Sequence, residues 1–271
     1  MSRLGIIAGG GSLPLKLIRA CQNTRKDFFV LALQGQADKE ALDGLPHRFV
    51  KLGATNEAIA VLKAENVDTI VLAGSVHRPN VLEMKPDMRT LQLFARLGPA
   101  ALGDDALLRA VAEEIEKEGF QILGAHEVDP GLITTEGVLT AKKPSPENEE
   151  DLRYGIKAAK TLGALDIGQT AVVQQGVVLG LEAVEGTDAL LKRCKDLRKK
   201  GRGGVLVKGC KPQQDNRLDL PTVGLRTVQL AYEAGLEGIA VEAGASLIVD
   251  REETVAAADK FGIFLKGYKA E

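Results

Sequence analysis

The sequence predicts an α/β protein with an N-terminal Rossmann-like parallel sheet and helices, plus a second, mixed α/β domain that contains a hairpin. In the first half, short apolar runs alternate with helical patterns, as they do in a parallel sheet. A glycine turn, residues 9–11, follows the first apolar run and precedes a helical pattern. In the second half, Gln175-Gly176 separates two apolar runs, which is typical of a β-hairpin.

Composition limits the classes of function. The chain has 271 residues, 45% of them hydrophobic, so it can build a core in one or two domains. A net charge of −2 and an aromatic content of 4% argue against a nucleic-acid binder. The three cysteines are far apart and form no C-x-x-C motif, which excludes a zinc cluster and indicates a reduced, cytoplasmic protein.

The sequence also predicts how the protein could contact a membrane. No apolar run reaches the ~18 residues that a membrane span requires. The first residues lead directly into a strand and a glycine turn, so we expect no signal peptide. Any contact with a membrane would therefore be peripheral.

The glycine turn is the first candidate binding element. A strand is expected at residues 4–8, and Ser12 is expected to cap the helix after the turn. Strand, glycine turn and helix N-terminus form the arrangement that binds phosphate through free N–H groups. The pattern is G-x-G-x-x-P, and no acidic residue follows the next strand, residues 28–33, to hold a ribose. This weakens an NAD site and leaves a diphosphate site, or a turn needed only for packing.

Further strands and helices continue the first domain. Strands are expected at residues 49–52, 68–73 and 119–124. Helices are expected at residues 55–63, which Thr55 would cap, at 87–97, and from 104 until Gly119 stops the helix. The loop after residue 73 should share an edge with the glycine turn, so Arg78 can bind an anion there. His77 is either a base or a surface residue. Asp104 and Asp105 either cap a helix or share in binding metal or substrate.

A polar stretch, residues 142–151, contains two prolines and is the best candidate for a linker. We expect a Rossmann-like domain that binds a nucleotide or diphosphate at residues 1–130. Residues 131–152 would form a linker or exchange segment, and residues 153–271 the second domain.

The second domain should begin with a helix and the hairpin. The helix is expected at residues 153–162, and the hairpin strands at 169–174 and 177–183. Thr187 can cap the next helix, which places Glu185 and Asp188 beside its N-terminus. That helix ends in a basic run: Lys192, Arg193, Lys195, Arg198, Lys199, Lys200 and Arg202. The run is either a solvated helix end or a contact for anionic lipid head groups, at ~1 kcal/mol per residue.

Residues 208–221 form an unusually polar loop between two packed elements, an apolar strand at 204–207 and an expected helix at 222–234. The loop contains the cations Lys208, Lys211 and Arg217, the carboxylates Asp215 and Asp219, and Gln214. Cations suit a phosphate, whereas carboxylates suit a metal ion or a water molecule. An extended backbone would place Arg217 and Asp219 on one face. The alternative is a solvated loop.

The end of the chain should complete the second sheet. Strands are expected at residues 238–241, 246–249 and 262–265, and a helix at 251–260. Glu242 follows a strand and precedes a glycine turn, so it is another candidate for the site.

Five blocks of sequence, in order along nearly the whole chain, carry a family resemblance: residues 6–14, 103–108, 182–188, 208–213 and 217–224. No single block is specific, but the ordered set resembles the LpxI-type UDP-2,3-diacylglucosamine pyrophosphatases of Gram-negative bacteria. The resemblance implies a Rossmann-like N-terminal domain and a lipid-binding C-terminal domain. It implies hydrolysis of UDP-2,3-diacylglucosamine to UMP and 2,3-diacylglucosamine 1-phosphate in lipid A biosynthesis. It also implies a divalent metal, usually Mg²⁺, and a homodimer.

The resemblance and the chemistry together define an expected site. The aspartate of the Arg-x-Asp-Leu-Pro block is Asp219, the implied catalytic residue, and Lys211 and Arg217 could neutralise a diphosphate beside it. Expected substrate-binding residues are Gly9, Gly10, Gly11, Ser12, Leu13, Arg78, Thr187, Lys208 and Gln214. Candidate Mg²⁺ ligands, not all of which would be used, are Asp219, Asp215, Asp104, Asp105, Glu185 and Asp188.

Two other classes of function stay open at this point. One is a nicotinamide-dependent oxidoreductase that uses the glycine turn, and the missing ribose carboxylate counts against it. The other is a non-catalytic carrier of a nucleotide sugar or lipid, although a pure phosphate binder gains nothing from Asp219. The expected partners are a lipid-linked UDP-sugar and, peripherally, the inner face of the inner membrane, with no nucleic acid.

Overall fold

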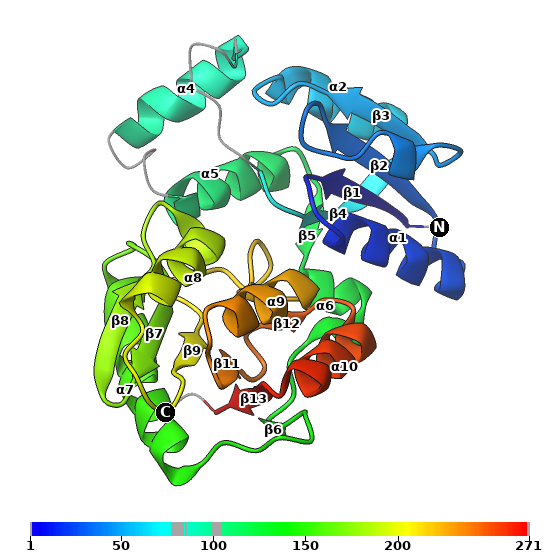
Figure 1. Ribbon diagram of the computed structural model, residues 1–271. Coiled ribbons are helices and arrows are strands. Elements are labelled where there is room, and N and C mark those ends of the chain that lie inside the picture. The colour runs from blue at the N-terminus through cyan, green and yellow to red at the C-terminus, as the bar shows by residue number, and fades with distance from the viewer. Residues whose placement is uncertain (1, 77–83, 85, 99–103, 270–271) are drawn as a thin grey trace. The chain divides into compact units, whose positions relative to one another are not determined.

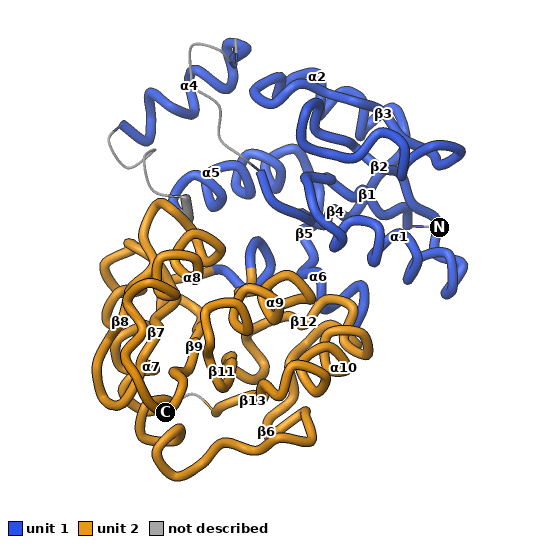
Figure 2. The backbone as a smooth tube through the Cα atoms, in the orientation of Figure 1, with its two compact units in different colours: residues 1–130, 215–219 blue, residues 131–214, 220–271 orange. Residues whose placement is uncertain are grey.

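The computed structural model describes all 271 residues except residues 1, 77–83, 85, 99–103 and 270–271. The chain forms two compact units (Figure 2). Unit 1 consists of Met1–Pro130 and Asp215–Asp219, and unit 2 of Gly131–Gln214 and Leu220–Glu271. The polar loop predicted to carry the chemistry therefore starts in unit 2, contributes a segment to unit 1, and returns to unit 2.

Unit 1 contains a parallel sheet in the order β3-β2-β1-β4-β5 (Figure 1). Its strands are β1 (Arg3–Ala8), β2 (Phe28–Leu33), β3 (His47–Val50), β4 (Val67–Ala73) and β5 (Gln121–Leu123). At the centre of the sheet, Ile6 is in register with Val30 on one side and Val71 on the other. The strand order reverses between β1 and β4, as in Rossmann-like sheets, so the predicted fold class is confirmed. Strand β3 lies two residues earlier than expected.

Helices of unit 1 include α1 (Leu13–Thr24), η1 (Glu40–Leu42), α2 (Thr55–Ala64), α4 (Met88–Leu97), α5 (Asp104–Lys117) and α6 (Ala125–Val128). Ser12 occupies the N-cap position of α1, as expected, but its side chain makes no capping hydrogen bond. The cap expected at Thr55 is wrong, because Thr55 is the first residue of α2, whose N-cap is Ala54. The Thr55 hydroxyl instead lies 2.7 Å from that of Thr90. Gly119 ends the α5 region with φ of +93°, as its position after the helical pattern predicted.

The core of unit 1 includes one residue from far along the chain. Phe29, Ile70, Ile115 and Phe120 form a buried cluster with Leu218. Only 7% of Leu218 is exposed, and burying a leucine contributes about 2 kcal/mol. This burial holds the segment Asp215–Asp219 in unit 1.

Unit 2 contains a mixed sheet in the order β6-β13-β11-β9-β7-β8. Its strands are β6 (Gly137–Val138), β7 (Thr170–Gln174), β8 (Val177–Leu181), β9 (Val205–Lys208), β11 (Gly238–Glu242) and β13 (Phe264–Tyr268). Strands β9, β11 and β13 are parallel, while β6, β7 and β8 add antiparallel edges. The predicted hairpin is confirmed, with positive φ at both Gln175 and Gly176. A second, two-stranded sheet pairs β10 (Thr222–Val223) with β12 (Leu247–Ile248).

Helices of unit 2 include α7 (Pro146–Ala164), α8 (Gly186–Leu197), α9 (Leu225–Glu233) and α10 (Arg251–Phe261), while η3 (Pro130–Leu132) lies at the unit boundary. Residues of α8, α9 and α10 share one apolar cluster with the sheet, and Leu152 of α7 belongs to another. Gly155 lets α7 approach the sheet closely, because a Cβ there would lie 2.5 Å from Val207. Within the part of the chain that the structure describes, no helix combines the length and apolarity of a membrane span.

Two expected elements of unit 2 are wrong at their starts. Helix α7 begins at Pro146 rather than at residue 153, so most of the polar stretch assigned to a linker is helical. Ser145 caps it reciprocally with Asn148, at 3.2 and 3.0 Å. Residues 222–223 form a short strand instead of the first turn of a helix, and α9 starts only at Leu225.

Candidate functional site

The glycine turn lies at the carboxyl edge of the unit 1 sheet, where the strand order reverses. Part of it is engaged in packing: the N–H of Gly9 donates to Ala73 at 2.8 Å, and Gly10 and Ser75 exchange backbone hydrogen bonds of 2.8 and 2.9 Å. A Cβ on Gly9 would lie 2.4 Å from the Ser75 carbonyl oxygen. A Cβ on Gly74, whose φ is +91°, would lie equally close to the Gly10 carbonyl oxygen. The turn therefore needs glycine for backbone packing, whatever it binds.

The rest of the turn, which begins at Gly11, is not held by such backbone contacts in the part of the chain that the structure describes. Gly11 has φ of +87°, and no atom lies within 4 Å of where its Cβ would be. The N–H groups of Gly11, Ser12 and Leu13 carry no hydrogen bond within the described residues, and Leu13 begins α1. Such groups at a helix N-terminus can donate to an anion. Of the predicted partners on the neighbouring loop, Arg78 lies outside the described residues, as does His77.

The first part of the polar loop is fixed in unit 2. The N–H of Cys210 donates to the Glu242 carboxylate at 2.9 Å, and Lys211 pairs with Asp166 at 2.6 Å. Gln214 closes the turn, since its side-chain oxygen accepts the N–H of Lys211 at 3.1 Å. The expected catalytic Lys211 is thus held by a carboxylate that the sequence pattern did not suggest.

The second part of the loop is fixed in unit 1. Arg217 binds Asp215 at 2.7 Å and Glu116 of α5 at 2.8 Å. Leu218 is buried, whereas Asp219, the next residue, is exposed. The catalytic candidate therefore follows directly upon an anchored arginine and a buried leucine.

Arg217 also controls the titration of Asp215. Hydrogen bonds from Arg217 hold the pKa of the Asp215 carboxyl below its usual range. Because the folded pKa is the lower one, the pair stabilises unit 1 fully above the unfolded pKa of about 3.9, and this contribution is lost as the pH falls through the folded value. We expect the parent to exceed an Asp215→Asn variant in stability by a constant margin from pH 7 to about 4, and by less below that. Urea unfolding followed by circular dichroism across this range would measure the margin, and a margin that persists at the lowest pH would contradict the assignment.

Lys208 and Thr187 are brought together in unit 2. Lys208 is buried at the end of β9, and its Nζ lies 3.1 Å from the Thr187 hydroxyl. Thr187 does not cap α8, as the sequence had suggested, because Glu185 occupies the N-cap position and the Thr187 hydroxyl donates to Glu182 at 2.6 Å. Both expected substrate-binding residues thus share one hydrogen-bond network.

Four of the six candidate metal ligands have side chains that the structure describes: Asp215, Asp219, Glu185 and Asp188. Among the described residues, no three His, Cys, Asp or Glu side chains are grouped as a metal site would require. Three of the six are already held by arginines: Asp215 by Arg217, Glu185 by Arg193 at 2.8 Å, and Asp188 by Arg226. Backbone N–H groups and Arg193 lower the pKa of Glu185.

Asp219 is the remaining candidate ligand with a described side chain, because those of Asp104 and Asp105, in the first turn of α5, lie outside the description. Magnesium is commonly bound by one or two carboxylates together with substrate phosphate oxygens and water. The described residues fit that kind of site and do not fit a preformed cage of protein ligands.

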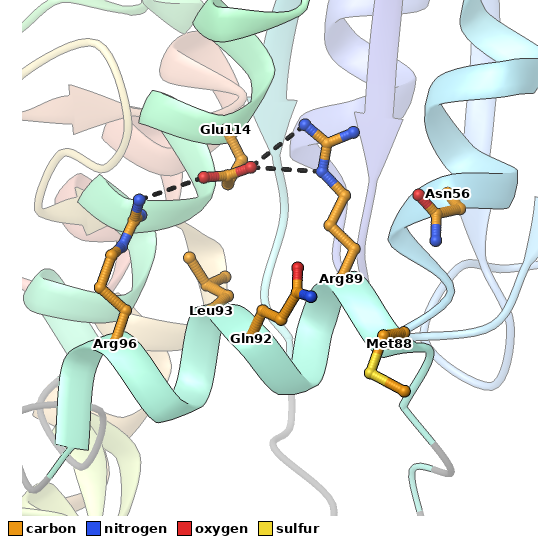
Figure 3. Close-up of a pocket in the computed structure, with 7 residues that line it drawn as sticks. All are labelled: Asn56, Met88, Arg89, Gln92, Leu93, Arg96 and Glu114. Carbon is orange, nitrogen blue, oxygen red and sulfur yellow. Dashed lines mark hydrogen bonds and ion pairs between the residues drawn. The ribbon is translucent and has the colours of Figure 1, made fainter.

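A pocket of about 480 Å³ in unit 1 lies between α4 and α5 (Figure 3). Arg89 and Arg96 extend from α4 toward Glu114 of α5, with N–O distances of 3.1 and 3.3 Å. Hydrogen bonds from Lys117 and Arg89 lower the pKa of Glu114. Of the described residues expected at the site, none lines this pocket. Both arginines of the pocket are paired with carboxylates, and these ion pairs hold α4 against α5.

Sequence reasoning missed several residues of this network. Asp166, which holds Lys211, was not predicted, because the two residues come from distant segments of the chain. Glu182, which accepts from the nearby Thr187, was not predicted because Thr187 was expected to cap a helix. The sequence did indicate Glu242, through its position at a strand end beside a glycine turn. No sequence pattern indicated Tyr268. Its burial and the nearby Glu242 raise the pKa of the Tyr268 hydroxyl. The position of the Tyr268 ring requires glycine at residue 209, because a Cβ there would lie 2.5 Å from the Tyr268 hydroxyl.

Comparisons with known proteins cover almost the whole chain. Residues 3–132 match the family model of the LpxI N-terminal domain, and residues 135–266 match that of the LpxI C-terminal domain. The UDP-2,3-diacylglucosamine pyrophosphatase LpxI of Caulobacter vibrioides is 46% identical over 274 aligned positions, covering 98% of each chain. The solved structures include an N5-carboxyaminoimidazole synthase from Aspergillus clavatus, with a TM-score of 0.27 and 13% identity over 73% of this chain and 44% of that one.

Proposed function

This chain belongs to the LpxI family, and from that premise we propose that it hydrolyses the diphosphate of UDP-2,3-diacylglucosamine to UMP and 2,3-diacylglucosamine 1-phosphate, in lipid A biosynthesis. The observation that carries the proposal is the identity of 46%, over 98% of both chains, with a relative named for that pyrophosphatase activity. The polar groups of the loop after β9 support it, because a diphosphate needs cations beside it and a carboxylate near the attacking water.

Within this function we assign roles by chemistry. Lys208 and Lys211 would donate N–H groups to anionic phosphate oxygens, and the backbone N–H groups of Gly11, Ser12 and Leu13 would bind the uridine nucleotide or its phosphate. Asp219 would orient or deprotonate the attacking water, or hold a metal ion. Arg217 positions Asp219 through its anchored backbone, since its guanidinium already binds Asp215 and Glu116.

We propose that Mg²⁺ or a similar divalent cation takes part, with Asp219 as its first protein ligand. When bound, such an ion would offset the negative charge of the diphosphate. The exposure of Asp219 and its place in the Arg-x-Asp-Leu-Pro block support this assignment.

The purified full chain, given UDP-2,3-diacylglucosamine dispersed in detergent and Mg²⁺, should release UMP, measured by chromatography. Removal of divalent ions with EDTA should abolish release, and added Mg²⁺ should restore it, because the diphosphate charge would otherwise be incompletely neutralised. Release that continues unchanged in EDTA would refute the metal while leaving the hydrolase intact. Binding of the lipid without UMP release would instead indicate a carrier.

We further propose that the enzyme acts in the cytoplasm, in peripheral contact with the inner face of the inner membrane. The exposed aliphatic side chains of unit 2 include Leu165, Ile167 and Val184, and such side chains can enter a lipid surface. Leu165 and Ile167 lie near Lys211, because Asp166, between them in the sequence, pairs with Lys211. The homodimer remains a prediction from the family resemblance.

A further inference from the structure

Three buried polar side chains form one row across the unit 2 sheet. Lys208 of β9 is in antiparallel register with Thr170 of β7, and the N–H of Glu182, directly after β8, donates to the Thr170 carbonyl at 2.9 Å. Partners in register on neighbouring strands place their side chains on the same face. The exposed fractions are 9% for Lys208, 0% for Thr170 and 7% for Glu182. Two ionisable groups are therefore withdrawn from water in one place, which requires compensating contacts.

Thr187, in the first turn of α8, connects the two ends of this row. The Thr187 hydroxyl donates to Glu182 Oε1 at 2.6 Å. Lys208 Nζ lies 3.1 Å from the Thr187 hydroxyl oxygen. A hydroxyl has a single hydrogen, so Thr187 can only accept from Lys208 while it donates to Glu182. Glu182 Oε2 accepts the N–H of Gln169 at 3.2 Å, which fixes the carboxylate from its other side. The direction of every hydrogen bond in the chain from Glu182 to Lys208 is thereby determined.

Among the described residues, this network leaves one donor of Lys208 available. An ammonium has three N–H groups, and the acceptors in this part of the chain are the Thr187 hydroxyl and, at 3.4 Å, the Thr222 carbonyl. No carboxylate among the described residues forms an ion pair with Lys208. Beside it, the buried hydroxyl of Thr170 has no hydrogen-bond partner in the described part of the chain. Buried polar groups normally have partners, so this end of the row is suited to an anionic ligand.

We propose that Glu182 is a positioning residue: acting through Thr187, it holds the Lys208 ammonium so that the third N–H meets a phosphate oxygen of the substrate. The identity of the substrate rests on the proposed function, whereas the geometry requires only an anionic oxygen. Without Glu182 the Thr187 hydroxyl could turn its hydrogen toward other acceptors, and Lys208 would lose its fixed direction.

The test uses the full chain, inorganic pyrophosphate as the probe, and calorimetry to measure binding. Thr187→Val keeps the shape of the side chain and removes the hydroxyl, so it should bind pyrophosphate about tenfold more weakly, the usual effect of losing a hydrogen bond to a charged group. Thr187→Ser restores the hydroxyl and should bind as the parent does. Glu182→Gln should weaken binding in the same direction. In a Lys208→Met background, Thr187→Val should have no further effect.

Two results would overturn the inference: equal binding by the Val and Ser variants, or a Thr187→Val effect that persists without Lys208. Equal melting temperatures of the Val and Ser variants would show that a difference in binding does not come from unfolding. Because pyrophosphate binding is measured without turnover, a parent that binds it but releases no UMP from the lipid would refute the proposed reaction and not the role of Glu182.

Discussion

An Asp219→Asn variant should hydrolyse UDP-2,3-diacylglucosamine about a thousandfold more slowly than the parent, with its fold unchanged. Asparagine has the shape of aspartate, but it can neither accept a proton from water nor supply the charge that holds a divalent ion. Positioned acid–base groups are worth about 10²–10⁴ in rate, and loss of a metal ligand acts in the same direction. The rate of UMP release at saturating substrate measures the effect.

The structure supports a sharp control for this experiment. Asp43 is also an exposed aspartate of unit 1, in the chain after η1. Asp43→Asn changes the net charge equally and should leave the rate as it is. Because Leu218 anchors the neighbouring backbone in the core of unit 1, Asp219→Asn should also unfold at the same urea concentration as the parent. A variant at Asp219 that retains a tenth or more of the parent rate would remove it from the catalytic step.

The parts of the site that could be predicted are those whose geometry depends on residues close together in the sequence. The strand, glycine turn and helix at the start of the chain depend on neighbouring residues, and Gly9 and Gly11 occupy the expected positions. The partner of the Gly9 turn, Gly74, follows another strand, and only the register of the parallel sheet brings the two backbones together. No local pattern specifies that contact.

The Glu182–Thr187–Lys208 network shows why site contacts were harder to predict than elements. Thr187 after a strand is a reasonable helix cap by local chemistry, yet its hydroxyl donates to Glu182, five residues earlier, and accepts from Lys208 on a separate strand. The register between β7 and β9 places Lys208 beside Thr170, and register is set by the pairing of distant strands. Likewise, nothing near Asp215 in the sequence shows that its segment joins unit 1, because this depends on the packing of Leu218 with distant apolar residues of that unit.

The start of α7 was mistaken for a linker because most of its first residues are polar. Local signals for a helix were present: Ser145 precedes Pro146, and Asn148 follows at the position that completes a capping box. One acidic residue of this polar stretch, Asp151, is buried with 1% exposed. Composition alone did not separate a buried, partnered carboxylate from a solvated one.

Asp151→Ala should lower the free energy of unfolding of unit 2 by about 3–5 kcal/mol, as expected when one member of a buried ion pair is removed. Asp151 binds Arg202 at 2.9 Å and accepts the N–H groups of Gln175 and Gly176 at 3.0 and 2.7 Å. It therefore joins α7 to the hairpin turn and to the loop before β9. Removing it leaves a largely buried guanidinium and two turn N–H groups without their acceptor.

Tyrosine fluorescence isolates this effect in the intact chain. The sequence has no tryptophan, and its three tyrosines, Tyr154, Tyr232 and Tyr268, all belong to unit 2. A urea transition followed by tyrosine emission therefore reports on unit 2 even if unit 1 unfolds separately. Glu150→Ala, at the exposed neighbouring position of the same helix, should shift the transition by less than about 0.5 kcal/mol. If both variants shift it equally, then the stability of the hairpin comes from apolar packing of the sheet, and the polar contacts of Asp151 add little to it.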